Sequence, residues 1–225
     1  MRTFSFRLLT AAVLLGAASL YARAAEMDYV DGHWTFNVGG GYSPAVGGIN
    51  NVLTDGWNFT MGTGYDFNEK MGVVFEFMSN NLGLENSVLN DYSARLGGLP
   101  TDGQMRMWSL SLSPTWRFSI ARGVGAYLIG GGGYYHVNAQ VTTPGVAYMP
   151  PYCDPFWGCW GGGLVDADRI VAEHKDDTGG VNFGGGITFN LGPNGMKLYI
   201  ESRYHYVLTS GRAISVLPLT VGFRF

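Results

Sequence analysis

The chain has 225 residues, a formal net charge of -3 and only 14% charged residues. Soluble domains average about 25% charged residues, so this chain lacks the Lys and Glu that usually coat a water-exposed surface, and it holds 35 glycines. The negative net charge leaves no basic footprint for nucleic acid, and we expect no nucleic-acid partner.

The N-terminal segment has the three parts of a secretory signal peptide. Two arginines make a positive region, residues 8–20 form an apolar stretch, and Ala22-Arg23-Ala24 places small residues at a cleavage site. The apolar stretch is shorter than the roughly 18 residues that cross a bilayer as a helix. We therefore expect a signal peptide over residues 1–24 and one mature domain over residues 25–225.

Eight runs of alternating apolar and polar residues follow, each typical of a β-strand with one apolar face. Turn residues bound these runs. They span residues 33–42, 57–67, 71–79, 106–118, 124–137, 180–191, 196–207 and a last run that begins near Ile214.

The fifth run is the least regular, because the glycines at 130–133 blur both of its faces. We assign its larger apolar residues to the outward face and His136 to the inward face. His205 also falls on the inward face of its strand, the seventh run, so the two histidines could approach each other. A metal site would need a third ligand, and none is evident, so we expect isolated histidines and no metal or cofactor. The outward set is Tyr127, Ile129, Tyr135 and Val137.

The connections alternate in length along most of the chain. Those after the second, fourth and sixth runs are tight, those after the first, third and fifth are long, and that after the seventh is shorter. This pattern is typical of an outer-membrane barrel with periplasmic turns and extracellular loops. We predict an all-β fold: an eight-stranded antiparallel up-and-down transmembrane β-barrel, with no helix longer than a turn or two.

A soluble barrel has the same alternation with its apolar face inward, so the orientation needs further support. The polar face is mostly Gly, Ser, Thr and Asn, which suits a narrow lumen better than open solvent. The apolar face is rich in Trp, Tyr and Phe near the strand ends, as in an interfacial aromatic girdle. Eight strands also leave too little interior space for so many aromatic rings. The apolar face is therefore expected to contact lipid.

The last two strands carry a family resemblance. Residues 199–206 read YIESRYHY, and the chain ends PLTVGFRF over residues 218–225. This pattern resembles the small outer-membrane β-barrel family of Gram-negative bacteria, the group around the OmpA transmembrane domain and the OmpX/Ail-type porin-like proteins. The resemblance implies a bacterial outer-membrane location, with the membrane lipid and the barrel-assembly machinery as partners. The assembly signal is the apolar face of the last strand: Leu217, Leu219, Val221, Phe223 and Phe225.

Charged residues at inward positions form a candidate lumen network. A charge in a narrow lumen must be paired or it is costly. We favour a salt-bridge plug with Glu76 and Glu201 as acceptors and Arg117 and Arg203 as donors; the alternative is a gate that admits small ions. The full set is Glu76, Arg117, Lys197, Glu201, Arg203 and Arg224.

The third long connection contains both cysteines. Cys153 and Cys159 lie close together in an exported chain, where a local disulfide is expected; a metal site would want more ligands nearby. The surrounding aromatic residues are a candidate binding surface for an unidentified ligand. Alternatively, this loop caps the barrel mouth or packs on lipid headgroups. The aromatic residues are Tyr148, Tyr152, Phe156, Trp157 and Trp160.

No residue pattern supports an enzyme. A lipid deacylase barrel would need Ser, His and an oriented acid on its lipid face, and His205 has inward parity. Asp176-Asp177 with His174 is similar to the rim acids of outer-membrane proteases, but the chain is too short for ten strands with long loops. We expect a non-catalytic envelope protein with a structural or surface-interaction role. A small-solute or ion channel is the alternative, followed by a lipid-modifying enzyme.

Overall fold

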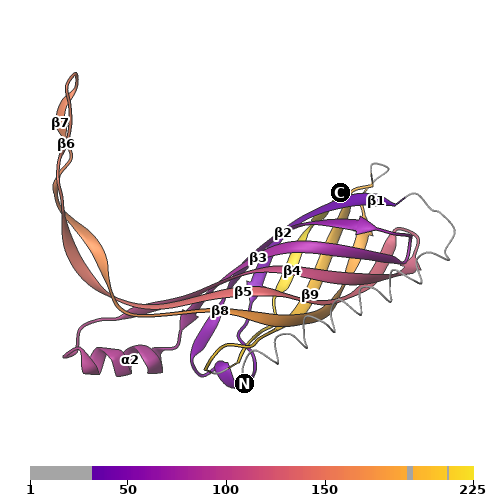
Figure 1. Ribbon diagram of the computed structural model, residues 1–225, viewed down its shortest axis with the longest axis horizontal. Coiled ribbons are helices and arrows are strands. Elements are labelled where there is room, and N and C mark those ends of the chain that lie inside the picture. The colour runs from indigo at the N-terminus through magenta and orange to yellow at the C-terminus, as the bar shows by residue number, and fades with distance from the viewer. Residues whose placement is uncertain (1–31, 192–194, 212) are drawn as a thin grey trace.

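The computed structural model describes residues 32–191, 195–211 and 213–225, so the predicted signal peptide lies outside the described residues. Long strands dominate the chain (Figure 1). They are β1 (His33–Ser43), β2 (Leu53–Asp66), β3 (Met71–Leu84), β4 (Asp102–Ala121), β5 (Val124–Met149), β8 (Gly163–Asn190), β9 (Lys197–Val207) and β11 (Leu219–Arg224). Shorter elements are η1 (Gly47–Ile49), α2 (Asn86–Arg95), β6 (Tyr152–Asp154), β7 (Gly158–Trp160) and β10 (Ile214–Val216).

The eight long strands close into a ring, which confirms the predicted barrel. The hydrogen-bonded order is β9-β11-β1-β2-β3-β4-β5-β8, and β8 pairs with β9 to complete the circle. All neighbouring strands are antiparallel. The last strand meets the first at Phe225 and Phe36, whose backbones exchange two hydrogen bonds. Closure removes the open sheet edges that a bilayer cannot solvate.

The final strand is split by Pro218, which has no N–H to donate to a ladder. On its extracellular side, β10 pairs with β9 and bridges Ala45. The N–H of Leu217 bonds to the carbonyl of Pro44, so the seam between the first and last strands continues past the proline. The two pieces therefore act as one strand of the wall.

The outer face of the barrel is apolar, as the alternation predicts. Exposed aromatic and aliphatic side chains cover it, including those of Trp34, Phe36, Trp57, Trp116, Phe118 and Leu128. Apolar exposure on this scale is unusual for a molecule in water but is expected of a wall in lipid.

The predicted orientation of β5 is wrong. Tyr127, Ile129, Tyr135 and Val137 are buried inside the barrel, and His136 faces outward. The rings fit inside because glycines on β8 lie beside them: Gly186 is the direct partner of Tyr127, and Gly180 is diagonal to Tyr135. A Cβ at either glycine would lie 2.7 Å from the ring. Pairing a large residue with glycine on a facing strand fills a small barrel without overpacking.

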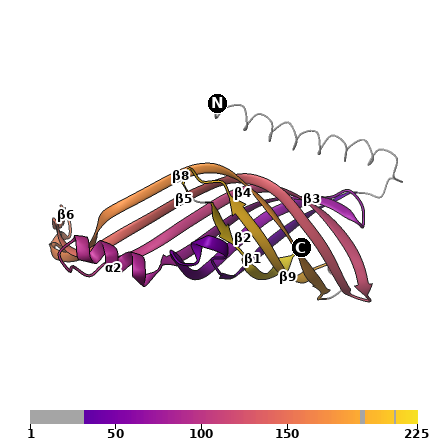
Figure 2. The same cartoon turned by 90° about the horizontal axis from the view of Figure 1, so that it is seen from below.

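Two of the long connections are more regular than predicted. The second contains the ten-residue helix α2, longer than the turn or two expected. The third, expected as a loop over residues 138–179, is a ribbon in which β5 and β8 stay paired out to Met149 and Gly163. This ribbon bends away from the line of the barrel and ends in the hairpin β6–β7 (Figures 1 and 2). Backbone pairing lets the segment project from the wall without leaving its polar groups unpaired.

Among the described residues, no helix is long and apolar enough to span a membrane.

Candidate functional site

The extracellular half of the barrel interior is filled with apolar side chains. Leu82, Met107, Val207 and Val216 are each almost fully buried there, and Ile49 of η1 packs against the same cluster. Strands β2, β3, β4, β5, β9 and β10 contribute to this layer, together with the segment between β1 and β2. Such close packing leaves little space for water or ions at this level.

A charged cluster lies next in the interior, centred on Arg203. Its guanidinium donates to Glu76 Oε1 at 2.9 Å and to Glu201 Oε1 at 2.9 Å from Nε and 2.5 Å from Nη2. Asn37 donates to the other Glu76 oxygen at 3.0 Å, and Tyr127 donates to the other Glu201 oxygen at 2.7 Å. Arg203 is 3% exposed, so each charge relies on these partners instead of water. We call these five residues the central cluster.

The remaining charges predicted for the network lie nearer the short-turn end. Arg117 pairs with Asp66, not with either glutamate, and His33 lies 3.4 Å from the same carboxylate. Arg224 stacks over two buried tyrosines, with its Cζ 4.9 Å from the Tyr127 ring centroid and 5.6 Å from that of Tyr199. Of the six residues predicted for the network, only Glu76, Glu201 and Arg203 are therefore bonded to one another. Sequence reasoning missed their partners Asn37 and Tyr127, and it missed Asp66, the partner of Arg117. The inward position of Asn37 and Asp66 could have been predicted from the sequence, because each follows an outward-facing aromatic residue within its strand.

The two histidines expected to approach each other lie on opposite faces of the wall. His205 is buried in the interior, where its Nδ1 is 2.9 Å from the Tyr135 hydroxyl. His136 lies on the outer face, stacks on Trp108 and contacts Asp177 at 2.5 Å. No group of three or more His, Cys, Asp or Glu side chains in the described ranges could hold a metal ion.

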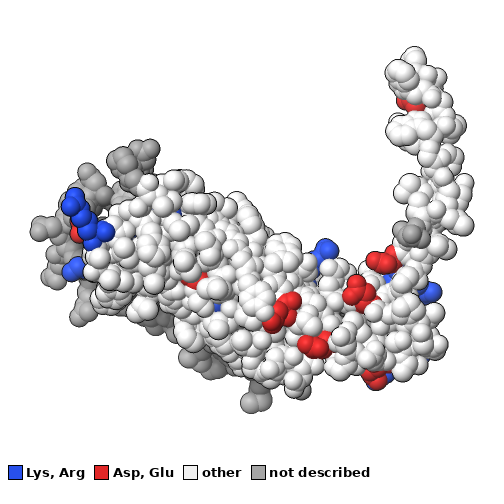
Figure 3. Space-filling model, turned by 180° about the vertical axis from the view of Figure 1, so that it is seen from behind, with Lys and Arg blue, Asp and Glu red and all other residues white. Residues whose placement is uncertain are grey.

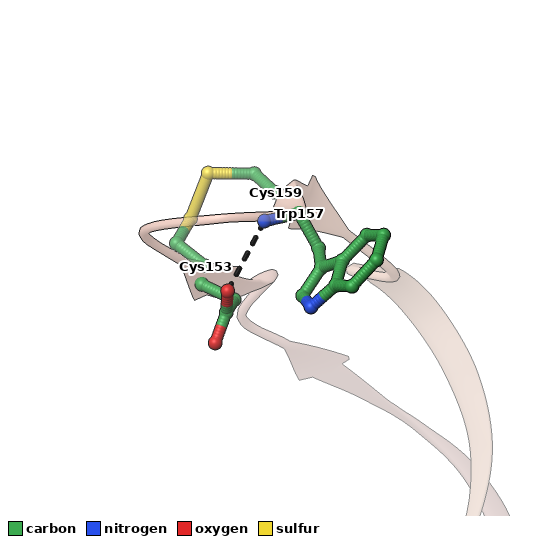
Figure 4. The surroundings of a disulfide bond; sticks show 4 residues. Cys153, Trp157 and Cys159 are labelled. Carbon is green, nitrogen blue, oxygen red and sulfur yellow. Dashed lines mark hydrogen bonds between the residues drawn. A yellow bond between two sulfur atoms is a disulfide. The ribbon is translucent and has the colours of Figure 1, made fainter.

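The tip of the ribbon presents aromatic residues. Cys153 and Cys159 form a disulfide across β6 and β7, as predicted (Figure 4). Asp154 Oδ1 accepts the backbone N–H groups of Phe156 at 2.8 Å and Trp157 at 3.1 Å, which fixes the turn between the two strands. The Phe156 and Trp157 side chains are 90% and 85% exposed. We call residues 152–160 the tip.

The other aromatic residues of the candidate surface lie beside this turn. Tyr152 and Trp160 are cross-strand partners whose rings meet edge to face at 5.6 Å. Tyr148 is exposed on the last part of β5. The part of the ribbon that includes the tip is almost uncharged, whereas acidic side chains gather near its base (Figure 3).

The base of the ribbon is tied to the neighbouring loop by a carboxylate. Asp176 accepts the backbone N–H of Ser210 at 2.6 Å and its hydroxyl at 3.0 Å. The backbone bond from Ser210 holds the pKa of Asp176 below its usual value. The hydrogen bond from Lys175, aided by that from Gln140, likewise lowers the pKa of Glu173. Both carboxylates therefore stay charged in mildly acidic solution.

The predicted assembly signal lies on the outer wall. Leu217, Leu219, Val221, Phe223 and Phe225 all expose their side chains there, while Arg224 between the last two is buried in the interior.

Comparison with known proteins agrees with this architecture. The chain matches the outer membrane protein beta-barrel domain family over residues 10–225. It is similar to the solved structure of Neisserial surface protein A (TM-score 0.56, 13% identity, 87% of this chain and 98% of that one). A major outer membrane protein from Thermus thermophilus is similar too (TM-score 0.55, 12% identity, 87% and 99%). Ail, the attachment invasion locus protein of Yersinia pestis, aligns with a TM-score of 0.48 at 21% identity, over 87% and 100%. No curated protein matches.

This chain belongs to the outer membrane protein beta-barrel domain family, and it is a bacterial outer-membrane protein. The solved structures share its fold at low identity and do not assign it an activity.

Proposed function

We propose that the protein is a non-catalytic outer-membrane barrel that contacts an external surface through the tip of the β5–β8 ribbon. The observation that carries this proposal is the pair Phe156 and Trp157, which are almost fully exposed at the end of a disulfide-closed hairpin. Exposed aromatic clusters on a braced scaffold are typical of binding surfaces. Each residue of an extended strand adds about 3.3 Å of length, so the ribbon holds the tip beyond the barrel wall.

The chemistry of the tip favours a lipid–water interface as the surface contacted. Its tryptophans and tyrosine combine apolar rings with a polar atom, the combination enriched where membranes meet water. The only charged residue of the tip, Asp154, is engaged by two backbone N–H groups. Acidic residues are in excess in the part of β8 behind the tip, which favours a zwitterionic over an anionic membrane. The described charges there are Asp168, Glu173, Asp176 and Asp177 against Arg169 and Lys175.

The proposal can be tested by sedimentation with phosphatidylcholine vesicles. The full protein is placed in nanodiscs, which remain in solution unless they bind the heavier vesicles. We expect the wild type to sediment and the double variant Phe156→Ser/Trp157→Ser to lose binding by more than about tenfold, since each buried aromatic ring contributes about 1.5–3 kcal/mol.

A matched control removes two other exposed apolar side chains of the ribbon. Val146→Ser/Leu164→Ser lies beside the tip and is expected to bind within about twofold of the wild type. Equal losses in both variants, or no sedimentation of the wild type, would contradict lipid contact by the tip. Capture of the wild type by cell surfaces that is abolished by treating those cells with protease would point to a protein partner instead.

We also propose that the lumen is closed to solutes. Two features support closure: the apolar layer in the extracellular half and the fully paired carboxylates of the central cluster. An ion crossing the barrel would have to displace packed side chains and then break buried ion pairs. A small-solute channel is the competing function, and its signature is a stable conductance across a planar bilayer.

A further inference from the structure

The short-turn end of the interior holds an open cavity of about 430 Å³. Side chains from β2, β4, β5, β8, β9 and β11 line it, so it lies inside the ring below the central cluster. Its volume falls in the range of small-molecule sites. Because the short turns of such barrels face the periplasm, a solute would reach this cavity from that side.

Three cations and two acids, Asp66 and Glu69, line the cavity, and the cations are not equally compensated. Arg117 is paired with Asp66. Arg224 and Lys197 are direct cross-strand partners on β11 and β9, which places two positive side chains side by side. Like charges directly opposite on neighbouring strands are destabilising. A counter-charge close to this pair would remove that cost.

Among the described residues, neither Asp66 nor Glu69 forms an ion pair with Lys197 or Arg224, although both line the cavity. Neither the Lys197 ammonium nor the Arg224 guanidinium forms an ion pair or a hydrogen bond with a described residue. Arg224 is 6% exposed, and its guanidinium stacks over the rings of two tyrosines. The central cluster has a formal net charge of -1 and attracts Arg224 without an ion pair, whereas the acid that attracts Lys197 is Asp66, which is already paired with Arg117.

We propose that Lys197 and Arg224 form a binding site for a small oxyanion, a phosphate or carboxylate group entering from the periplasm. The guanidinium offers a planar fork of donors that matches either group, and the ammonium adds a mobile point charge. Thr188 and Asn190 line the same cavity and provide further hydrogen-bonding groups. The oxyanion site does not depend on the β5–β8 ribbon or on the proposed contact of its tip with lipid.

The proposal is tested by calorimetric titration of the full protein with inorganic phosphate. A neutral detergent is used, because it contributes no phosphate, and ionic strength is held constant with chloride. We expect saturable binding that Lys197→Gln weakens by about tenfold or more, as removal of one charged hydrogen bond should. Lys70→Gln is the matched control: this exposed cation lies on a turn at the same end and should leave binding within about twofold.

Further measurements separate the sources of the anion and guard against misfolding. Arg224→Gln should also weaken binding, but Lys197→Gln carries the test because Lys197 is less buried and its loss is less disruptive to folding.

Titration with acetate asks whether a carboxylate binds as well as phosphate. Repeating the phosphate titration in phosphatidylglycerol nanodiscs asks whether a lipid headgroup already fills the site, in which case free phosphate binding disappears there but not in detergent. Absence of saturable phosphate binding in detergent, or equal weakening by Lys197→Gln and Lys70→Gln, would overturn the proposal.

Discussion

Replacement of Arg203 by methionine should strongly destabilise the barrel. Arg203 is 3% exposed, and among the described residues it is the one cation that bonds directly to both Glu76 and Glu201. Without it, two buried carboxylates would face each other with only Asn37 and Tyr127 as donors. Breaking a buried ion pair from one side costs about 3–5 kcal/mol. We expect Arg203→Met to lower the free energy of unfolding by that amount.

The measurement is urea unfolding in phospholipid vesicles, followed by tryptophan fluorescence and by the shift between folded and heated migration on a gel. Two further variants isolate the reason for the loss. Glu76→Gln/Glu201→Gln/Arg203→Met removes all three charges and should recover most of the stability, because replacing a whole buried ionic cluster is often neutral. Arg106→Met removes an exposed arginine and should change stability by less than about 0.5 kcal/mol. If Arg203→Met unfolded at the wild-type urea concentration, or the triple variant were less stable than the single one, the argument from buried charge would fail.

Three other outcomes follow from contacts elsewhere in the molecule. Gly180→Ala should destabilise the barrel by about 1–3 kcal/mol in the same assay, because a Cβ there would lie 2.7 Å from a buried tyrosine ring; wild-type stability would refute the tight fit. The lowered pKa of Asp176 means that its hydrogen bond with Ser210 is stable above the usual aspartate pKa of about 4 and weakens as pH falls below it; the protection factor of the Ser210 amide, which corrects its exchange rate for the intrinsic effect of pH, should therefore fall at low pH in the wild type, and Asp176→Asn should abolish that fall. Cys153→Ser/Cys159→Ser should speed proteolysis within the tip and leave barrel unfolding unchanged, whereas an unfolding midpoint shifted as much as the tip is loosened would show that the two are coupled.

The strands could be predicted from the sequence because alternation is strong wherever one face meets lipid. The last strand shows this well: its outward leucines, valine and phenylalanines alternate with Arg224, and its pairing with β1 closes the predicted barrel. β5 could not be oriented in this way, because its interior face is as apolar as its outer face. Only the glycines on facing strands make room for Tyr127 and Tyr135, and those contacts depend on register between distant segments.

The sequence identifies the charged residues of the interior, but it does not show which of them contact one another. Alternation along a strand shows which face of the wall a side chain occupies, but it does not show how far along the barrel axis that side chain lies. Arg117 and Arg203 therefore looked equivalent in the sequence, whereas the pairing register sets Arg117 beside Asp66 and Arg203 beside the two glutamates. The ribbon was missed for a related reason: turn residues within 138–179 indicated a loop, while long-range pairing of β5 with β8 makes it regular.

The measurement that tests the closed barrel most directly is single-channel recording in planar bilayers. With the apolar layer packed and the central cluster fully paired, the wild-type protein should show no stable open level across the usual voltage range. A stable open level in the wild type that Glu201→Gln or Arg203→Gln removed would contradict closure and identify the central cluster as part of a conducting path.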